Sequence, residues 1–365
     1  MAQISHELKY YKHSMRILVN RLFGREVVAL DKYPAVEVSG VCNLNCVFCA
    51  YKDKDAGKVV MSNDDFTNNI NQLADLGHDH LVLTPQTGDV FIDKHFGDKI
   101  AVLERHPKIK SYEFITNLIS ASDAVLDRLA KAQKLTRMYI SLYGHTQENF
   151  EKITGRSHSQ YRRLIKNINY LAQIAPDFKG GLGGFVMTNR DLSWSPHKPA
   201  SDDFDESDVL RAVRNLAECD QDFYWSGNHV DFDSWGGRIT QSELDELDLG
   251  FRVVGPSVPM IGPCGMLFGG AVILADGQVN ACGCRAVGTG LIIGDSKTTP
   301  LREILSPDNP KFKALLARHT KGDYPEDCIG CKIFTSIYRR PHGRDVTTVE
   351  GFIAGQRKRC ERTAS

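Results

Sequence analysis

The chain has 365 residues, 42% hydrophobic and 25% charged, which is the balance of a globular protein large enough for one barrel or two ordinary domains. Its 45 basic and 45 acidic residues cancel, so no overall field favours a nucleic acid or an anionic membrane. No stretch reaches the roughly 18 apolar residues of a membrane span, and the N-terminus lacks the apolar core of a signal peptide. We therefore expect a cytoplasmic protein.

The N-terminal residues 7–23 have an amphipathic pattern that predicts a helix packed on the end of a barrel. Residues 35–41 then predict a strand that leads into a cysteine-rich loop. Five more strand patterns alternate with helical patterns, at residues 80–85, 111–116, 137–144, 180–188 and 222–233. This alternation predicts six parallel βαβ units and hence a partial, TIM-like (β/α)6 barrel. In such a sheet the chemistry lies at the carboxyl ends of the strands, where the cysteine loop is expected.

The pattern changes near residue 255. Residues 271–284 predict a β-hairpin around an Asp276-Gly277 turn, and short helical patterns follow, so we expect a small cysteine-rich α+β domain joined through a linker over 240–260. The basic end of the chain is interpreted as a solvated tail that binds no nucleic acid. The expected units are an N-terminal helical extension, the barrel, the cysteine-rich domain and the tail, at residues 1–34, 35–240, 241–340 and 341–365.

Ten cysteines are distributed unevenly along the chain, and in a reducing compartment clustered cysteines serve more often as metal ligands or redox groups than as disulfides. The first cluster is Cys42, Cys46 and Cys49, in "CNLNCVFC". Three thiolates at C-x3-C-x2-C spacing can hold one face of a cubic iron–sulfur cluster and leave its fourth iron open, as in a catalytic site. The alternative is a zinc knuckle whose fourth ligand comes from His78 or His80.

This motif resembles the CxxxCxxC signature of the radical S-adenosylmethionine (radical SAM) enzymes, in which an aromatic residue precedes the last cysteine, as Phe48 does here. The resemblance implies a 4Fe–4S cluster on the three cysteines, with SAM bound at the open iron. It also implies reductive cleavage of SAM to a 5′-deoxyadenosyl radical, which takes a hydrogen atom from the substrate. An electron donor such as flavodoxin or ferredoxin is the implied partner.

The resemblance continues at the ends of the following strands. "TPQTGDVF" stands where the family has a GGE-like motif that contacts the SAM amino group, which makes Thr87, Gly88 and Asp89 candidates for SAM binding. An aspartate can accept the same charge-assisted hydrogen bond as a glutamate, with a shorter reach. Further candidates, taken by position in the family pattern, are Thr116 and Asn117 near the ligand, Ser141 for the ribose and Arg156 for the carboxylate.

The second cysteine group follows the predicted linker, with Cys264, Gly277 and Cys282 in one pattern and Cys328 and Cys331 in "CIGC". It resembles the SPASM extension or its shortened form, twitch, and the later cysteines of a full SPASM pattern are missing. The resemblance implies one auxiliary 4Fe–4S cluster held by these four cysteines. A structural zinc site is the alternative, since two cysteine pairs are also the pattern of zinc.

Three cysteines have no place in these ligand sets. Cys284 can replace Cys282 as a ligand, lie beside the cluster as an inert thiol, or act as the catalytic hydrogen-atom donor of an epimerase. Cys219 and Cys360 stand alone in the sequence and are interpreted as small buried apolar residues.

The lead hypothesis is hydrogen abstraction from a small polar, sugar-like substrate, with oxidation, dehydration or epimerisation as outcome. The alternatives are a ribosomal-peptide maturase of the same superfamily and a non-catalytic iron–sulfur or zinc scaffold. Only 34 residues precede the first predicted strand, too few for the peptide-recognition module of many maturases, which favours the small substrate. Residues 228–239 offer Asp231, Asp233, Trp235 and Arg238 as a carbohydrate-like set, or else form a plain charged loop between domains.

Overall fold

The computed structural model describes residues 2–30, 32–54, 57–83, 86–178, 183–190, 207–283 and 287–362. The helices are α1 Ala2–Leu22, α2 Asn63–Asp75, α3 Phe96–Arg105, α4 Asp123–Ala130, α5 Gln147–Thr154, α6 His158–Ile174, α7 Asp208–Cys219, α8 Gln241–Asp245, α9 Leu301–Ile304, α10 Pro310–Lys321 and α11 Val349–Arg362. The strands are β1 Val27–Ala29, β2 Ala35–Val36, β3 His80–Leu83, β4 Ser111–Thr116, β5 Leu135–Leu142, β6 Phe185–Asn189, β7 Tyr224–Asn228, β8 Asp231–Phe232, β9 Arg252–Val253, β10 Val272–Ile273, β11 Gln278–Asn280, β12 Ile292–Asp295 and β13 Val346–Thr348.

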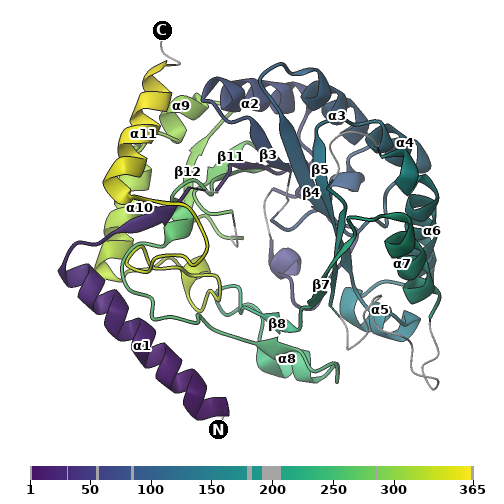
Figure 1. Ribbon diagram of the computed structural model, residues 1–365, viewed down its shortest axis with the longest axis horizontal. Coiled ribbons are helices and arrows are strands. Elements are labelled where there is room, and N and C mark those ends of the chain that lie inside the picture. The colour runs from purple at the N-terminus through teal and green to yellow at the C-terminus, as the bar shows by residue number, and fades with distance from the viewer. Residues whose placement is uncertain are drawn as a thin grey trace.

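A nine-stranded sheet with the order β12-β11-β10-β2-β3-β4-β5-β6-β7 organises the molecule. Strands β2 to β7 are all parallel and neighbour one another in chain order, which confirms the six predicted units of a partial barrel. Helices α2, α3, α4, α6 and α7 form an arc outside these strands (Figure 1). The carboxyl ends of all six strands therefore lie along one edge of the sheet.

The local sequence explains the individual units. Helix α2 begins after Ser62, whose side chain accepts a hydrogen bond from the amide of Asp65 at 3.0 Å, a standard N-cap. Its buried residues Phe66, Ile70 and Leu73 recur at helical spacing and face the sheet. The first strand is shorter than expected because the chain leaves the sheet after Val36, and Ser39 then bridges to Val60 instead. The sixth predicted strand is divided into β7 and the separate β8.

The cysteine-rich part continues the sheet of the barrel. Strand β10 pairs in parallel with β2, so that Val272 lies opposite Ala35, and the predicted hairpin adds β11 beyond β10. Gly277 has φ +97° in the tight turn of this hairpin, a conformation that side chains disfavour. The expected boundary near residue 240 thus separates two parts of one continuous sheet, and the expected linker contains α8 and β9.

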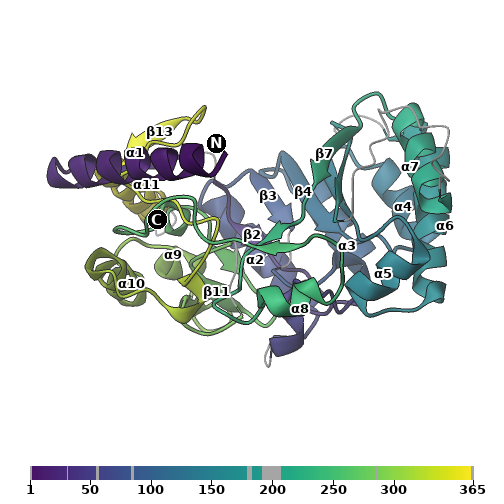
Figure 2. The ribbon, with the colours of Figure 1, turned by 90° about the horizontal axis from the view of Figure 1, so that it is seen from below.

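The two ends of the described chain meet on the cysteine-rich part. Strand β1 pairs antiparallel with β13, and α1 and α11 lie on the same side of the molecule (Figure 2). The basic end of the chain forms the last turns of α11, where residues 357–359, 361 and 362 are exposed as expected, while the ring of Phe352 at the start of this helix packs on Phe268 with centroids 5.6 Å apart. Among the described residues, no helix is both long enough and apolar enough to span a bilayer.

Candidate active site and auxiliary cysteine site

The first cysteine loop follows β2 and is held from outside by the chain around α5. The amide of Asn45 donates to the carbonyl of Thr154 at 2.9 Å, and Val47 donates to Ile153 at 3.0 Å. Arg156 Nε donates to the carbonyl of Asn43 at 2.7 Å. These three hydrogen bonds fix the loop between the first and last cysteine. Arg156, which the sequence predicted to contact the carboxylate of SAM, therefore also holds this loop in shape.

The three thiols of this loop lie close enough to influence one another. Burial raises the pKa of Cys42 to about 12, with the carboxyl of Asp89 as second cause, and burial also raises the pKa of Cys46. The neighbouring thiols also raise the pKa of Cys46, and the guanidinium of Arg190 lowers it. Three neighbouring thiolates, of which Cys46 is buried and Cys42 and Cys49 are half-buried, need a compensating cation, and an iron–sulfur cluster would supply one. The donor set therefore fits an iron–sulfur cluster.

Phe48 anchors the loop to the last units of the barrel. Its ring stacks on Phe232 with centroids 4.1 Å apart and an interplanar angle of 5°, and Arg190 lies 5.8 Å over the same ring. Its carbonyl accepts a hydrogen bond from the indole of Trp235 at 3.1 Å. Trp235 is buried and packs under the loop, so the hypothesis that it offers a stacking platform is wrong. Asp231 pairs with Arg252 at 2.7 Å instead of facing the barrel mouth.

Asp89, at the end of the unit that contains β3, is buried beside the cysteine loop. Its carboxylate accepts hydrogen bonds from the amide of Asn117 at 2.7 Å, the hydroxyl of Thr116 at 2.9 Å and the amide of Phe91 at 3.0 Å. Burial nevertheless outweighs these donors and raises the pKa of Asp89 to about 6. A carboxylate has about four acceptor positions, so three donors leave one position for a further donor.

The backbone around Gly88 is packed tightly against the segment that follows β2. A β-carbon at Gly88 would lie 1.8 Å from the carbonyl oxygen of Ser39, and the amide of Asp89 donates to the carbonyl of Val41 at 2.9 Å. Only glycine fits at position 88, for this steric reason. The hydroxyl of Thr87 is buried and has no hydrogen-bond partner within the described ranges.

The remaining candidates for SAM binding lie along the same edge of the sheet. Asn117 Nδ2 donates to Asn43 Oδ1 at 2.8 Å and lies 3.9 Å from the sulfur of Cys42. Ser141, at the carboxyl end of β5, is buried, and its hydroxyl is 3.5 Å from that of Thr188 on β6. The structure thus brings Asp89 and Asn117 to the cysteine loop, with Ser141 further along the edge.

The second group of cysteines lines a single cavity. Burial raises the pKa of Cys264 to about 11 and that of Cys331 to about 12, and it also raises that of Cys328. Each of these thiols is further influenced by Cys282, which completes the set of four around the cavity. Within the described ranges no three His, Cys, Asp or Glu side chains are gathered tightly enough for a single metal ion. The four thiols surround a space, as the ligands of a cluster do.

Two residues that the sequence analysis missed contact this second site. His319 on α10 is fully buried, lines the same cavity, and has its Nε2 3.9 Å from the sulfur of Cys328. Gln86, just before the Thr87-Gly88-Asp89 segment, donates from its Nε2 to the carbonyl of Cys282 at 2.8 Å. The only sequence signal for His319 is its place on a helix that leads into the CIGC turn, and Gln86 has none.

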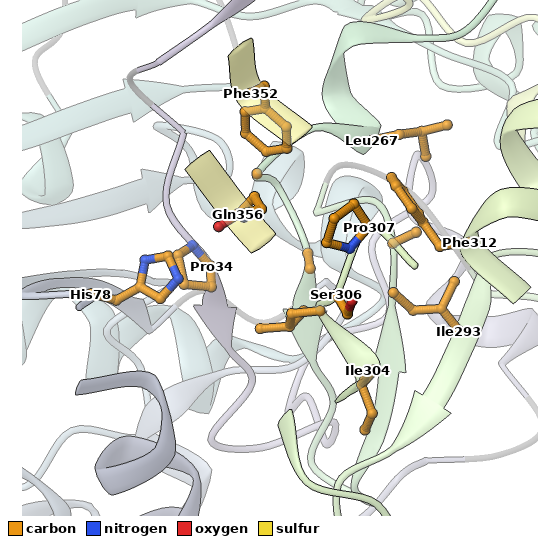
Figure 3. Close-up of a pocket in the computed structure, with 14 residues that line it drawn as sticks. Pro34, His78, Leu267, Ile293, Ile304, Ser306, Pro307, Phe312, Phe352 and Gln356 are labelled. Carbon is orange, nitrogen blue, oxygen red and sulfur yellow. The ribbon is translucent and has the colours of Figure 1, made fainter. Parts of the chain in front are cut away.

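The other predicted residues lie elsewhere. Cys284 falls outside the described residues. His80 forms a hydrogen bond with Ser111 at 2.7 Å, at the amino end of the sheet. His78 lines an apolar cavity beside α11 (Figure 3). Neither histidine therefore reaches the cysteine loop, which lies at the carboxyl ends of the strands. Cys219 is exposed, which corrects its interpretation as buried, because α7 ends there at the surface; Cys360 is half-buried.

The cavity of Figure 3 is separate from the three-cysteine loop and shares only the wall residue Leu267 with the cavity of the auxiliary cysteines. Side chains such as Leu267, Phe312 and Phe352 surround it, and no cysteine is among its lining residues in the described part of the chain. It is a packing space between α11 and the cysteine-rich part.

Several solved structures are similar to this chain at low identity. BtrN in complex with AdoMet and 2-DOIA is 13% identical, with a TM-score of 0.48 over 80% of this chain and 88% of that one. SuiB of Streptococcus suis bound to precursor peptide SuiA is 14% identical, with a TM-score of 0.49 over 78% of this chain and 67% of that one. His6-tagged anSMEcpe with bound AdoMet is 12% identical, with a TM-score of 0.48 over 91% of this chain and 92% of that one.

Family comparison bears directly on the two cysteine sites. No curated protein matches the chain. Residues 36–191 match the radical SAM superfamily, and residues 264–332 match SPASM, an iron–sulfur cluster-binding domain. The first range contains the three-cysteine loop and the second contains the four-cysteine cavity, which accounts for SAM and 4Fe–4S clusters as cofactors. The chain therefore belongs to the radical SAM superfamily and has a C-terminal SPASM iron–sulfur domain.

Proposed function

We propose that this enzyme abstracts a hydrogen atom from a carbon of a small polar, sugar-like molecule. The observation that supports this is a set of enclosed, uncharged hydrogen-bonding groups at the carboxyl ends of β5 and β6. On β6, Asn189 is 0% exposed and Thr188 is half-buried, and both lie beside Ser141 of β5, which is assigned to the ribose of SAM. Enclosed hydroxyl and amide groups suit a compact molecule rich in hydroxyls, whose polar groups then all find partners.

The proposed roles follow the geometry of the two sites. Cys42, Cys46 and Cys49 would hold the SAM-binding cluster, and the auxiliary ligands would be Cys264, Cys282, Cys328 and Cys331. The bound cluster and SAM supply the 5′-deoxyadenosyl radical. Around them, Asp89 offers its free acceptor position to the SAM ammonium, Ser141 bonds the ribose, and Asn117 and Arg156 fix the loop that carries Cys42.

The substrate class is tested by following 5′-deoxyadenosine under dithionite with a panel of sugars, aminocyclitols and short peptides. A deuterated sugar-like substrate should transfer its label to 5′-deoxyadenosine. Asn189→Ala should lower kcat/KM for that substrate about tenfold, the cost of one buried hydrogen bond, while uncoupled SAM cleavage stays unchanged. A response to peptides alone would favour a maturase and contradict the proposal, and a zinc-loaded protein that never cleaves SAM would exclude both enzymes.

The outcome of the reaction is tested at Cys284. In an epimerase this thiol would return a hydrogen atom to the substrate radical, whereas in an oxidation the auxiliary cluster would accept the electron. Cys284→Ala with unchanged iron content and lost turnover would indicate the hydrogen donor. Lost iron would indicate a ligand, and unchanged turnover would exclude Cys284 as the hydrogen donor.

SAM binding should depend on the protonation of Asp89. Burial raises the pKa of this carboxyl to about 6, so the folded protein binds the proton more tightly than the unfolded chain does. The contribution of Asp89 to the free energy of unfolding therefore falls as pH rises towards 6. The ammonium of SAM requires the ionised form. We expect the affinity for SAM, measured by equilibrium binding, to fall up to about tenfold for each pH unit below 6. Asp89→Asn should bind SAM weakly at pH 7.5 and without this dependence; an unchanged pH profile in the variant would exclude the contact.

A further inference from the structure

A groove of about 610 Å³ lies beside the SPASM part, lined by α1 and by the segment that precedes β13. Its lining includes five permanent cations, namely Arg16, Lys32, Arg339, Arg340 and Arg344, together with two histidines. Among the described residues that line it there is no aspartate or glutamate. Since the whole chain has no net charge, the positive charge of this groove is a local feature.

The cations of the groove influence one another across it. The pKa of His13 on α1 is lowered by partial burial and then by the charge of Arg339, which comes from the segment before β13. Cations from distant parts of the sequence therefore converge on one space. Such a concentration attracts an acidic partner and raises its rate of association.

The groove shares a wall with the cavity of the auxiliary cysteines. Met266 and Ile333 line both spaces, so a single layer of side chains separates them. Lys32 donates to the carbonyl of Gly265, the residue after Cys264, and its charge lowers the pKa of that thiol. A molecule seated in the groove is thus held next to the auxiliary site.

We propose that this groove docks an acidic one-electron carrier protein, with a flavin or iron–sulfur cofactor, that exchanges electrons with the auxiliary cluster. The inference rests on the proposed function, in which that cluster takes one electron from the substrate radical during oxidation. The reduced cluster then loses one electron and the oxidised carrier gains it, with no bond made or broken. A nucleic acid would be attracted by the charge alone, whereas the shared wall specifically favours a redox protein.

The test measures electron exchange directly. The reconstituted enzyme is reduced with dithionite, freed from excess reductant and mixed with an oxidised acidic flavodoxin in a stopped-flow instrument. We expect a bimolecular rate constant that falls steeply with salt in the wild type. In the Arg340→Glu/Arg344→Glu variant the rate constant should fall at least about tenfold, and it should depend less on salt. Dithionite-driven formation of 5′-deoxyadenosine should be equal in both proteins.

The matched control is Arg162→Glu/Arg163→Glu, which makes the same charge change on the exposed surface of α6, across the molecule from the groove (Figure 1). It should exchange electrons at the wild-type rate. The docking site would be overturned if wild type and groove variant exchanged electrons at equal rates, or if the control lost as much of the rate as the groove variant. It would also be overturned if the groove cations only retained a DNA duplex while electron exchange stayed unchanged. Failure of 5′-deoxyadenosine formation in the wild type would instead count against the proposed function.

Discussion

Replacing Cys46 with alanine should abolish SAM cleavage and remove about half of the iron. Two 4Fe–4S clusters amount to about eight irons per chain. A cluster with only two cysteine ligands should be lost, so about four irons should remain in the variant. Cys46 is buried in the loop that α5 and Arg156 hold in place, so the substitution removes a ligand with little effect on the fold. Iron and sulfide content and 5′-deoxyadenosine formation are the measurements.

The matched control for this variant is Cys219→Ala. Cys219 is exposed at the end of α7, far along the chain from both cysteine sites, and its removal should leave iron content and SAM cleavage at wild-type levels. If Cys46→Ala kept the full iron content, or if both variants lost the same amount, the assignment of the three-cysteine loop would be wrong.

Gly88→Ala should be the most damaging substitution outside the cysteines. The new β-carbon would lie 1.8 Å from the backbone oxygen of Ser39, and because the backbone fixes its position, only a backbone shift can relieve the clash. The segment that carries Asp89 must then move away from the cysteine loop. We expect a loss of stability of about 1–3 kcal/mol or more, typical of overpacking, together with weakened SAM binding.

Urea unfolding and equilibrium SAM binding measure these two effects. Gly255→Ala is the control, because a β-carbon at that position meets no atom within 4 Å and the backbone does not require glycine. Wild-type stability in Gly88→Ala would show that the two segments are not in contact as described.

The sequence predicted those features that depend on local pattern. Strand β4 was predicted with its observed bounds, because alternating burial over Ser111–Thr116 gives a clear signal and a helix follows closely. The C-x3-C-x2-C spacing likewise identified the superfamily. Strand β2 was predicted too long, because beyond Val36 the chain pairs with residues 59–61 instead: the amide of Met61 donates to the carbonyl of Val38, and the amide of Gly40 donates to that of Val59.

Features that depend on distant contacts were not predictable in this way. An aromatic and charged loop around Trp235 has the composition of a sugar-binding surface, yet its indole donates to Phe48, 187 positions away in the chain. His319 and Gln86 reach the auxiliary site through packing of α10 and of the loop after β3. The buried row of Ser141 and Asn189 depends on the register between β5 and β6, which composition does not reveal.

The pairing of β10 with β2 has a consequence for synthesis on the ribosome. Strand β2 is made early, but its second neighbour, β10, is about 235 residues further along the chain. Throughout that interval the nascent barrel has an unpaired edge, and open strand edges are templates for aggregation. The protein therefore depends on protection of this edge during translation, and truncations that end before Val272 should yield insoluble chains rather than a free-standing barrel.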